Sequence, residues 1–175
     1  MLATQLLFVL FAAAAIFCAL MMVTRANPVS CAVWLIGTFF SLAAIYTLLG
    51  AFFIGVIQIL VYAGAIMVLF LFVIMLLNLG NDYEPDMRSD VWKVAGAGAG
   101  LVMLALLARL FFGGAQTPLV EATGPAALAA LTAERGSVGV VGIPMYTDFV
   151  VHLQVTGILL LVAVVGAVML AKRSV

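Results

Sequence analysis

The feature that most constrains this chain is its near-total lack of charge over residues 2–79. That stretch holds one side chain of the acidic, basic or histidine type, Arg25. The whole chain is 8% charged and 67% hydrophobic, whereas soluble domains carry about 25% charged residues. Fourteen charges are too few to cover a water-soluble globule, which excludes a cytosolic enzyme, and a net charge of zero leaves no electrostatic footprint for nucleic acid. The chain is therefore predicted to be an integral membrane protein in contact with lipid.

Apolar runs divide the chain into five predicted bilayer crossings, each of which needs about 20 residues. Strands are not favoured, because the alternation typical of a barrel is absent. The first run has no basic region before it and exceeds the roughly 7–15 apolar residues of a signal peptide, so we expect a retained helix. The prediction is an all-α integral membrane protein with a single membrane domain, residues 1–175, and helices at residues 2–24, 29–49, 52–79, 91–112 and 149–171.

The segment between the last two predicted crossings, residues 113–146, is predicted to lie outside the membrane. Pro125 follows Thr123 and Gly124, which predicts the start of a short helix over residues 126–133. Residues 136–144 are rich in glycine and valine, and we expect no helix there. Basic residues favour the cytoplasmic side of a membrane. Five crossings put the N-terminus outside and the C-terminus in the cytoplasm, because one side then collects Arg25, Arg88, Lys93, Lys172 and Arg173, and the other only Arg109 and Arg135.

The sequence predicts no metal or cofactor site. Cys18 and Cys31 lie inside apolar runs, without a C-x-x-C pair or a cluster containing histidine, and are expected to pack as small hydrophobic side chains. Gly96 and Gly100 form a G-x-x-x-G pattern, which is typical of a contact surface between membrane helices. A chain that pumps protons unaided needs acids or bases within the membrane. The first three predicted crossings supply none, so we do not expect a self-sufficient pump.

The third predicted crossing is the most unusual element. A straight helix over residues 52–79 would be about 42 Å long, against a hydrocarbon core of about 30 Å. Tilt, projecting ends or a π-bulge can absorb the excess. Gln58 and Tyr62 are four residues apart, which predicts one shared face, and Gly55 and Ala65 are expected on that face too. The simplest interpretation is that the polar side chains hydrogen-bond to a neighbouring helix while the small residues pack against it.

Polar side chains gather at the start of the last predicted helix. Asp148, His152 and Thr156 are spaced at four and therefore share a face. One interpretation is a short proton-exchange stripe, because histidine titrates nearest to neutral pH. The interpretation we favour is a helix N-terminus at the membrane interface, capped by Thr147 or Asp148.

Residues 57–76, with the sequence IQILVYAGAIMVLFLFVIML, carry a specific family resemblance. Together with residues 27–56, the segment Tyr146-Thr147-Asp148-Phe149 and residues 159–172, they resemble subunit J of bacterial NADH–quinone oxidoreductase, respiratory complex I. The mitochondrial counterpart is subunit 6. The resemblance covers nearly the whole chain and is weakest over residues 113–142.

This resemblance implies a five-helix accessory subunit near the junction of the quinone-binding arm and the proton-pumping membrane arm. It implies a π-bulge between Tyr62 and Val68, whose rotation or straightening connects or breaks a water path between neighbouring subunits. The residues it assigns to the switch are Tyr62, Ala63, Gly64, Ala65 and Val68, with Gln58 as polar neighbour. Some members have a glutamate where Gln154 stands here, which removes any proton-carrying role at that position.

The resemblance also implies what the chain leaves to others. NADH, FMN, the iron–sulfur clusters and the quinone belong to other subunits, and this chain binds no cofactor. Its partners are the neighbouring small subunits, the quinone-site subunit and the antiporter-like subunits, in a bacterial inner (plasma) membrane. The alternatives are a subunit of a related cation/proton antiporter or membrane-bound hydrogenase, and a stand-alone transporter, which the absence of buried acids disfavours.

Overall fold

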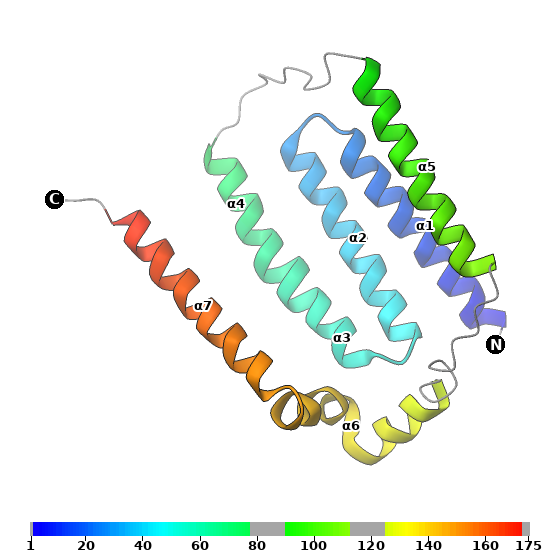
Figure 1. Ribbon diagram of the computed structural model, residues 1–175, viewed down its shortest axis with the longest axis vertical. Coiled ribbons are helices and arrows are strands. Elements are labelled where there is room, and N and C mark those ends of the chain that lie inside the picture. The colour runs from blue at the N-terminus through cyan, green and yellow to red at the C-terminus, as the bar shows by residue number, and fades with distance from the viewer. Residues whose placement is uncertain (1, 78–89, 113–124, 173–175) are drawn as a thin grey trace. The chain divides into compact units, whose positions relative to one another are not determined.

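The computed structural model describes residues 2–77, 90–112 and 125–172 (Figure 1). Every regular element in these ranges is helical, which confirms the all-α prediction. In chain order the elements are α1 (Leu2–Thr24), α2 (Pro28–Leu48), α3 (Phe52–Ile57), the π-helix η1 (Gln58–Ile66), α4 (Met67–Leu77), α5 (Asp90–Phe112), α6 (Pro125–Thr147) and α7 (Val150–Ala171).

The chain forms two compact units, Met1–Pro125 and Ala126–Val175. In the first unit α2 contacts α1 as well as α3, η1 and α4. The last three elements follow one another without a break, and we call them together the third span, Phe52–Leu77. Figure 1 shows α1, α2 and the third span as neighbouring helices that run in alternating directions. The predicted end of this helix at residue 79 lies outside the described residues.

The start of α2 is set by an asparagine and a proline. Asn27 is the N-cap, and its side-chain Oδ1 accepts hydrogen bonds from the backbone N–H groups of Val29 at 2.9 Å and Ser30 at 3.4 Å. Pro28 occupies the first helical position, where a missing N–H costs nothing. The helix therefore begins one residue earlier than predicted.

The end of α2 is set by Gly50, which has a φ of 83°. The Gly50 N–H donates to the Thr47 carbonyl at 3.1 Å, and the Ala51 N–H donates to the Tyr46 carbonyl at 2.9 Å. This pair of bonds is the Schellman motif, in which glycine is favoured because a Cβ is strained at positive φ. The tight turn lets the third span begin at Phe52 and return along α2.

Helices α1 and α2 approach closely at a glycine. A Cβ placed on Gly37 would lie 3.1 Å from the Sγ of Cys18, so the cysteine fills the space that a side chain at position 37 would need. Phe17 and Trp34 meet edge to face, with ring centroids 5.7 Å apart. Small-to-large pairing of this kind lets apolar helices pack where hydrophobicity alone gives no preference over lipid.

Among the residues that the structure describes, four helices are long and apolar enough to cross a membrane: Leu2–Thr24, Pro28–Leu48, Phe52–Leu77 and Val150–Ala171. Helix α5 falls at the fourth predicted crossing, but its apolar stretch, Val94–Arg109, is shorter. The fifth crossing therefore stays a prediction. A Cβ at Gly96 or Gly100 would meet no atom within 4 Å among the described residues, so the predicted contact surface stays a prediction.

The second unit corrects the prediction for residues 136–144. They are helical, as part of α6. The break expected from their glycine content is confined to Gly136, whose φ of 72° and ψ of 161° divide α6 into two helices. Pro144 lies inside the second, and its carbonyl accepts the N–H groups of both Asp148 and Phe149 at 2.9 Å. A single glycine destabilises a helix by only about 1 kcal/mol, so the glycine content of this segment does not prevent a helix from forming.

The predicted cap of α7 is also wrong. Its N-cap is Phe149, without a side-chain hydrogen bond. The Thr147 hydroxyl instead donates backwards to the Ile143 carbonyl at 3.0 Å, because Thr147 is the last residue of α6.

Candidate functional site

The candidate site is the π-helical middle of the third span. The span has 26 residues, which as a regular α-helix would be about 39 Å long. Nine of them, Gln58–Ile66, adopt π geometry. Runs of π-helix are rare and often mark functional positions. The predicted π-bulge is confirmed, but it begins at Gln58 instead of Tyr62 and ends at Ile66, so Val68 lies outside it, in α4.

The π segment is entered and left through ordinary α geometry. Ile57 and Met67, the residues that flank it, both have α-helical dihedral angles. The Met67 N–H donates to the Tyr62 carbonyl, five residues earlier, where an α-helix would use the residue four earlier. Each such ring holds one extra residue. A Cβ on Gly64 would lie 3.2 Å from the Ile59 carbonyl oxygen, so the glycine keeps this wider turn free of crowding.

Just before the π segment, Gly55 brings the backbone of α3 against α2. Gly55 is buried. A Cβ on it would lie 2.9 Å from the Thr47 Oγ1 and 3.0 Å from the Ala43 carbonyl oxygen. The Thr47 hydroxyl itself donates to that carbonyl at 2.9 Å. Because backbone atoms of α2 and the Thr47 hydroxyl occupy the space of a side chain, only glycine fits here without displacement.

Within the π segment, one residue contacts α2 through an aromatic ring. The Tyr62 ring meets the Phe39 ring of α2 edge to face, with centroids 5.8 Å apart. Its neighbour Ala63 is buried. Further along, α4 buries Met67 and Ile74. The face that packs on α2 is thus built from a glycine, an alanine and two larger aliphatic side chains.

The shared face of Gln58, Tyr62, Gly55 and Ala65 stays a prediction, and the four residues differ in exposure. Gly55 is buried and Gln58 is half-buried, while Tyr62 and Ala65 are exposed. The prediction assumed the α-helical period, and the longer π turn changes that period from Gln58 onward. The small run at residues 63–65 is likewise split, with Ala63 buried and its two neighbours exposed.

Sequence reasoning missed the α2 side of the site. Phe39, Ala43 and Thr47 follow one another at intervals of four, so they lie on one face of α2. Thr47 carried a detectable signal, as a hydroxyl residue in an apolar run. Gly55 carried another, because it is the one small residue between Phe52 and Ile57.

The site contains no acid or base. The third span, like α1 and α2, has no Asp, Glu, Lys, Arg or His in its sequence. In the described ranges, residues 2–77, 90–112 and 125–172, no group of three His, Cys, Asp or Glu side chains is placed to hold a metal ion. What this arrangement offers is therefore a change of helix geometry and of packing, with no carboxylate, amine, guanidinium or imidazole in the sequence of the third span.

The polar stripe at the start of α7, made of Asp148, His152 and Thr156, lies in the second unit. Asp148 lies in the turn before the helix, and the Phe149 ring meets the His152 ring edge to face at 5.7 Å. The Thr156 hydroxyl donates to the His152 carbonyl at 2.7 Å. Thr156 is thus bonded to its own helix, and all three side chains of the stripe are exposed.

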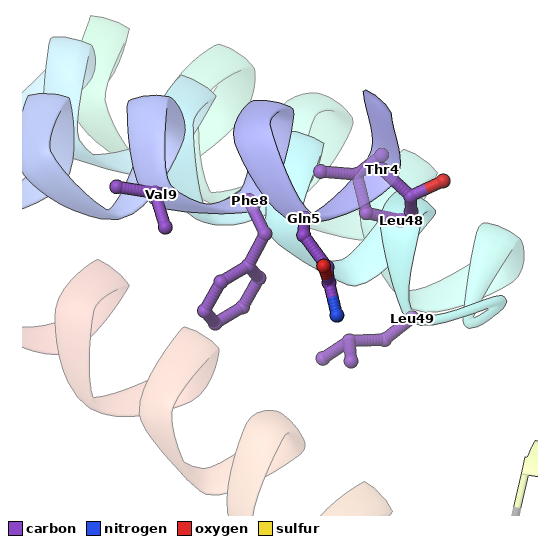
Figure 2. A pocket seen from close by; sticks show the side chains of 6 residues that line it. All are labelled: Thr4, Gln5, Phe8, Val9, Leu48 and Leu49. Carbon is purple, nitrogen blue, oxygen red and sulfur yellow. The ribbon is translucent and has the colours of Figure 1, made fainter. Parts of the chain in front are cut away.

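A further hollow lies at the end of the α1–α2 pair. It is lined by Thr4, Gln5, Phe8, Val9, Leu48 and Leu49. Figure 2 shows Gln5 and Phe8 projecting from α1, with Leu49 at the end of α2. The lining is apolar apart from Thr4 and Gln5, and it holds no charged side chain.

These features define a multi-pass α-helical membrane protein whose distinctive element is an interrupted span. The chain belongs to the NADH-ubiquinone/plastoquinone oxidoreductase chain 6 family, whose model matches residues 18–170. It is 39% identical to NADH-quinone oxidoreductase subunit J of Rhodobacter capsulatus, over 95% of this chain and 80% of that protein. It is 33% identical to subunit J of Pseudomonas aeruginosa, over 93% of both chains. The subunit J of Escherichia coli K12 is 32% identical, over 87% of this chain and 78% of that protein.

Proposed function

We propose that this chain is a membrane-arm subunit of a proton-translocating NADH:quinone oxidoreductase and helps couple quinone reduction to proton translocation. The single observation that carries the proposal is the π segment Gln58–Ile66 in an uncharged span. The names of its relatives support it, because they are subunits J and chain 6 of NADH- and NAD(P)H-quinone oxidoreductases. The chain has no active site of its own and acts through its neighbours.

The physical basis of coupling is the extra residue in the π turn. When the segment relaxes to a regular helix, every residue after it turns by about 100°, the angle of one residue in an α-helix. That rotation re-aims the exposed side chains of α4 at adjacent subunits. A water path between subunits is thereby made or broken, which requires no titrating group in this chain.

The residues we assign to the switch are Tyr62, Ala63, Gly64 and Ala65, with Gln58 as the polar side chain at its start. Val68 lies two residues beyond the π segment, so we assign it to the part that moves. Gln58 is the first residue of the segment and half-buried, which suits a hydrogen-bonding partner in a neighbouring helix.

The surroundings of the chain follow from the same proposal. NADH, FMN, iron–sulfur clusters and quinone are bound by other subunits. The partners of this chain are the neighbouring small subunits, the quinone-site subunit and the antiporter-like subunits of the membrane arm. It crosses a bacterial inner membrane five times, with the N-terminus outside and the C-terminus in the cytoplasm. Helix α5 supplies the additional crossing.

Electrophoresis under native conditions tests this assignment. The tagged chain, extracted from its membrane in mild detergent, is expected to migrate in one large assembly that oxidises NADH. A small free oligomer would contradict the proposal in favour of a stand-alone transporter. A large assembly without NADH oxidation would contradict it in favour of an antiporter or hydrogenase subunit.

A liposome assay tests the absence of ion transport by the chain alone. Reconstituted without partners, the chain is expected to leave an imposed pH gradient intact. A protein-specific collapse of the gradient would contradict the proposal. Empty liposomes and liposomes with a proton channel serve as the two controls.

A further inference from the structure

The second half of α6, residues 137–147, is a short apolar helix. The break at Gly136 separates it from the first half, and its sequence contains no Asp, Glu, Lys, Arg or His. The hydroxyl of Thr147 donates to the Ile143 carbonyl at 3.0 Å, so it is satisfied within the helix. A helix of this length extends about 16 Å, roughly half the thickness of the hydrocarbon core. It is therefore too short to cross a membrane.

The surface of this helix is apolar and exposed. None of residues 137–147 is buried by the described part of the chain. Val138 and Ile143 are 58% and 46% exposed, and Tyr146 is 74% exposed. An apolar helix of about 10–14 residues is typical of a protein core, of the membrane interface or of a re-entrant segment. Because its side chains are exposed, the structure does not make it a core helix, and the other two settings both place it in lipid.

The turn between α6 and α7 fixes the depth of this helix. Helix α7, Val150–Ala171, is long and apolar enough to cross a membrane, and it begins three residues after Thr147. Three residues reach at most about 10 Å. The Pro144 carbonyl accepts the N–H groups of Asp148 and Phe149, both at 2.9 Å, which keeps the turn compact. The end of α6 therefore lies close to the membrane boundary at which α7 begins.

Charged side chains flank the helix at both ends. Glu134 and Arg135 lie just before the break and are exposed, and Asp148 follows in the turn and is exposed too. Charged groups are costly within the hydrocarbon, so both ends of the helix are at the water side. Since the helix is too short to cross, both ends lie at the same surface of the membrane. A helix held in this way runs along that surface.

The backbone at Gly136 separates the charged part of α6 from the apolar part. Its φ of 72° lies in the region that side chains with a Cβ rarely adopt. Figure 1 shows the two halves of α6 running in different directions from this point. The change of direction lets the chain leave the water after Arg135 and enter the lipid surface at Ser137.

We infer that residues 137–147 form a helix that lies in the surface layer of the lipid bilayer beside the start of α7, with phospholipid as its partner. Its aliphatic side chains contact the acyl chains, and the Tyr146 ring lies at the level of the headgroups, where tyrosine is enriched. The inference goes beyond the proposed function, because it requires only that α7 crosses the membrane. It differs from the sequence-based expectation, which placed this helix outside the membrane.

Photocrosslinking of the full chain in its native membrane tests which partner covers the helix. The photoreactive residue p-benzoylphenylalanine replaces Val138 or Ile143, which lie about 140° apart around the helix axis. After irradiation, mass spectrometry of the chain identifies the attached molecule. Phospholipid adducts are expected at one or both positions. At the control position Ala133, next to the exposed Glu134, they are expected to be at least about tenfold fewer.

Two results of this experiment would overturn the inference. Adducts with another protein in place of lipid at both Val138 and Ile143 would show that a neighbouring subunit covers the helix. Lipid adducts no more frequent than at Ala133 would show that the helix lies in water.

A pair of charged substitutions at Met145 tests the same contact by a second measurement. The lysine of Met145→Lys has a long aliphatic stem, so its ammonium group can reach water from the interface. The shorter side chain of Met145→Asp holds its carboxylate among the acyl chains, which is costly. The amount of full-length chain in the membrane is expected to be at least about threefold lower for Met145→Asp than for Met145→Lys.

The matched pair Ala133→Asp and Ala133→Lys controls for the different helix propensities of the two residues. These two variants are expected to accumulate equally, within about 1.5-fold. Equal amounts of Met145→Asp and Met145→Lys would overturn the inference, because a helix in water tolerates both charges and a helix packed on protein tolerates neither.

Discussion

The third span and α7 are similar in sequence and different in structure. Both are apolar helices of more than 20 residues. The third span packs on α2 through Gly55, Ala63, Met67 and Ile74 and contains nine π-helical residues. Helix α7 is a regular α-helix over Val150–Ala171, and none of its residues is buried.

The difference indicates that irregular helix geometry persists where packing contacts stabilise it. A π turn has less favourable hydrogen bonding than an α turn, so it needs contacts that compensate. The third span has them on both sides of the π segment, at Gly55 and at Met67. Helix α7 has no buried residue in the described part of the chain and adopts the regular form. The π segment is thus a property of the packing as well as of its own residues.

The strongest test of this difference in packing is a valine substitution at one glycine in each region. Gly55→Val places a branched side chain where even a Cβ lies 2.9 Å from Thr47 Oγ1. We expect proton pumping by the intact complex to fall about tenfold or more, since overpacking of this kind displaces backbone. NADH oxidation by an artificial electron acceptor measures the rest of the complex and is expected to be unchanged.

The matched control lies in α7. A Cβ on Gly157 would meet no described atom within 4 Å, so Gly157→Val is expected to change pumping by less than about twofold. Equal losses in the two variants would contradict the idea that the contact with α2 is what matters. An equal loss of artificial-acceptor activity in Gly55→Val would show a failure of assembly instead.

The aromatic contact between α2 and the π segment tests this difference at a single pair of side chains. A double-mutant cycle with Phe39→Ala and Tyr62→Ala is expected to give a coupling energy of about 0.5–1.5 kcal/mol, as for other edge-to-face pairs. The free energy of unfolding of the purified chain in mixed micelles measures it. If the effects of the two substitutions on the free energy of unfolding are additive, the two rings do not interact. The Phe149–His152 pair, exposed at the start of α7, is the control and is expected to give less.

Removing the N-cap of α2 is expected to have a moderate effect on the first unit. Asn27→Ala leaves the Val29 and Ser30 N–H groups without their acceptor and is expected to cost about 1 kcal/mol of unfolding free energy. Asn27→Ser is expected to recover most of the loss, because serine is also a strong N-cap residue. If Asn27→Ser is as unstable as Asn27→Ala, the cap is not the cause.

The smallest effect is expected at the polar stripe of α7. His152 is exposed and contacts the Phe149 ring, and its carbonyl accepts the Thr156 hydroxyl. A histidine in this setting marks a helix start, so His152→Ala is expected to change pumping by less than about twofold. A loss as large as that of Gly55→Val would assign α7 a proton-exchange role and would remove the contrast between the two regions.

Much of this fold follows from local chemistry. Long apolar runs locate α1, α2, the third span and α7, and Asn27 with Pro28 places the start of α2. The length of the third span predicts that it deviates from a straight helix. Helical continuity over residues 136–144 was not predictable from composition, because glycine and valine are only weakly unfavourable in helices and a single residue, Gly136, carries the break.

The candidate site is predictable only in part. The small residues near Gly64 indicate where the helix is irregular, but the limits of the π segment depend on contacts with another helix. Gly55 lies against Ala43 only because the turn at Gly50 returns the chain along α2. A periodic pattern within one helix carries no information about that register, so the contact between Gly55 and Ala43 could not be predicted from it.

The most direct test of the central claim is the number of protons pumped per NADH oxidised by the intact complex carrying Gly64→Val. Valine crowds the Ile59 carbonyl and is stiff at χ1, so it biases the π segment toward one state. The ratio is expected to fall by about half or more, while NADH oxidation by an artificial acceptor and the amount of assembled complex stay the same. An unchanged ratio in a fully assembled complex would contradict a switching role of the π segment.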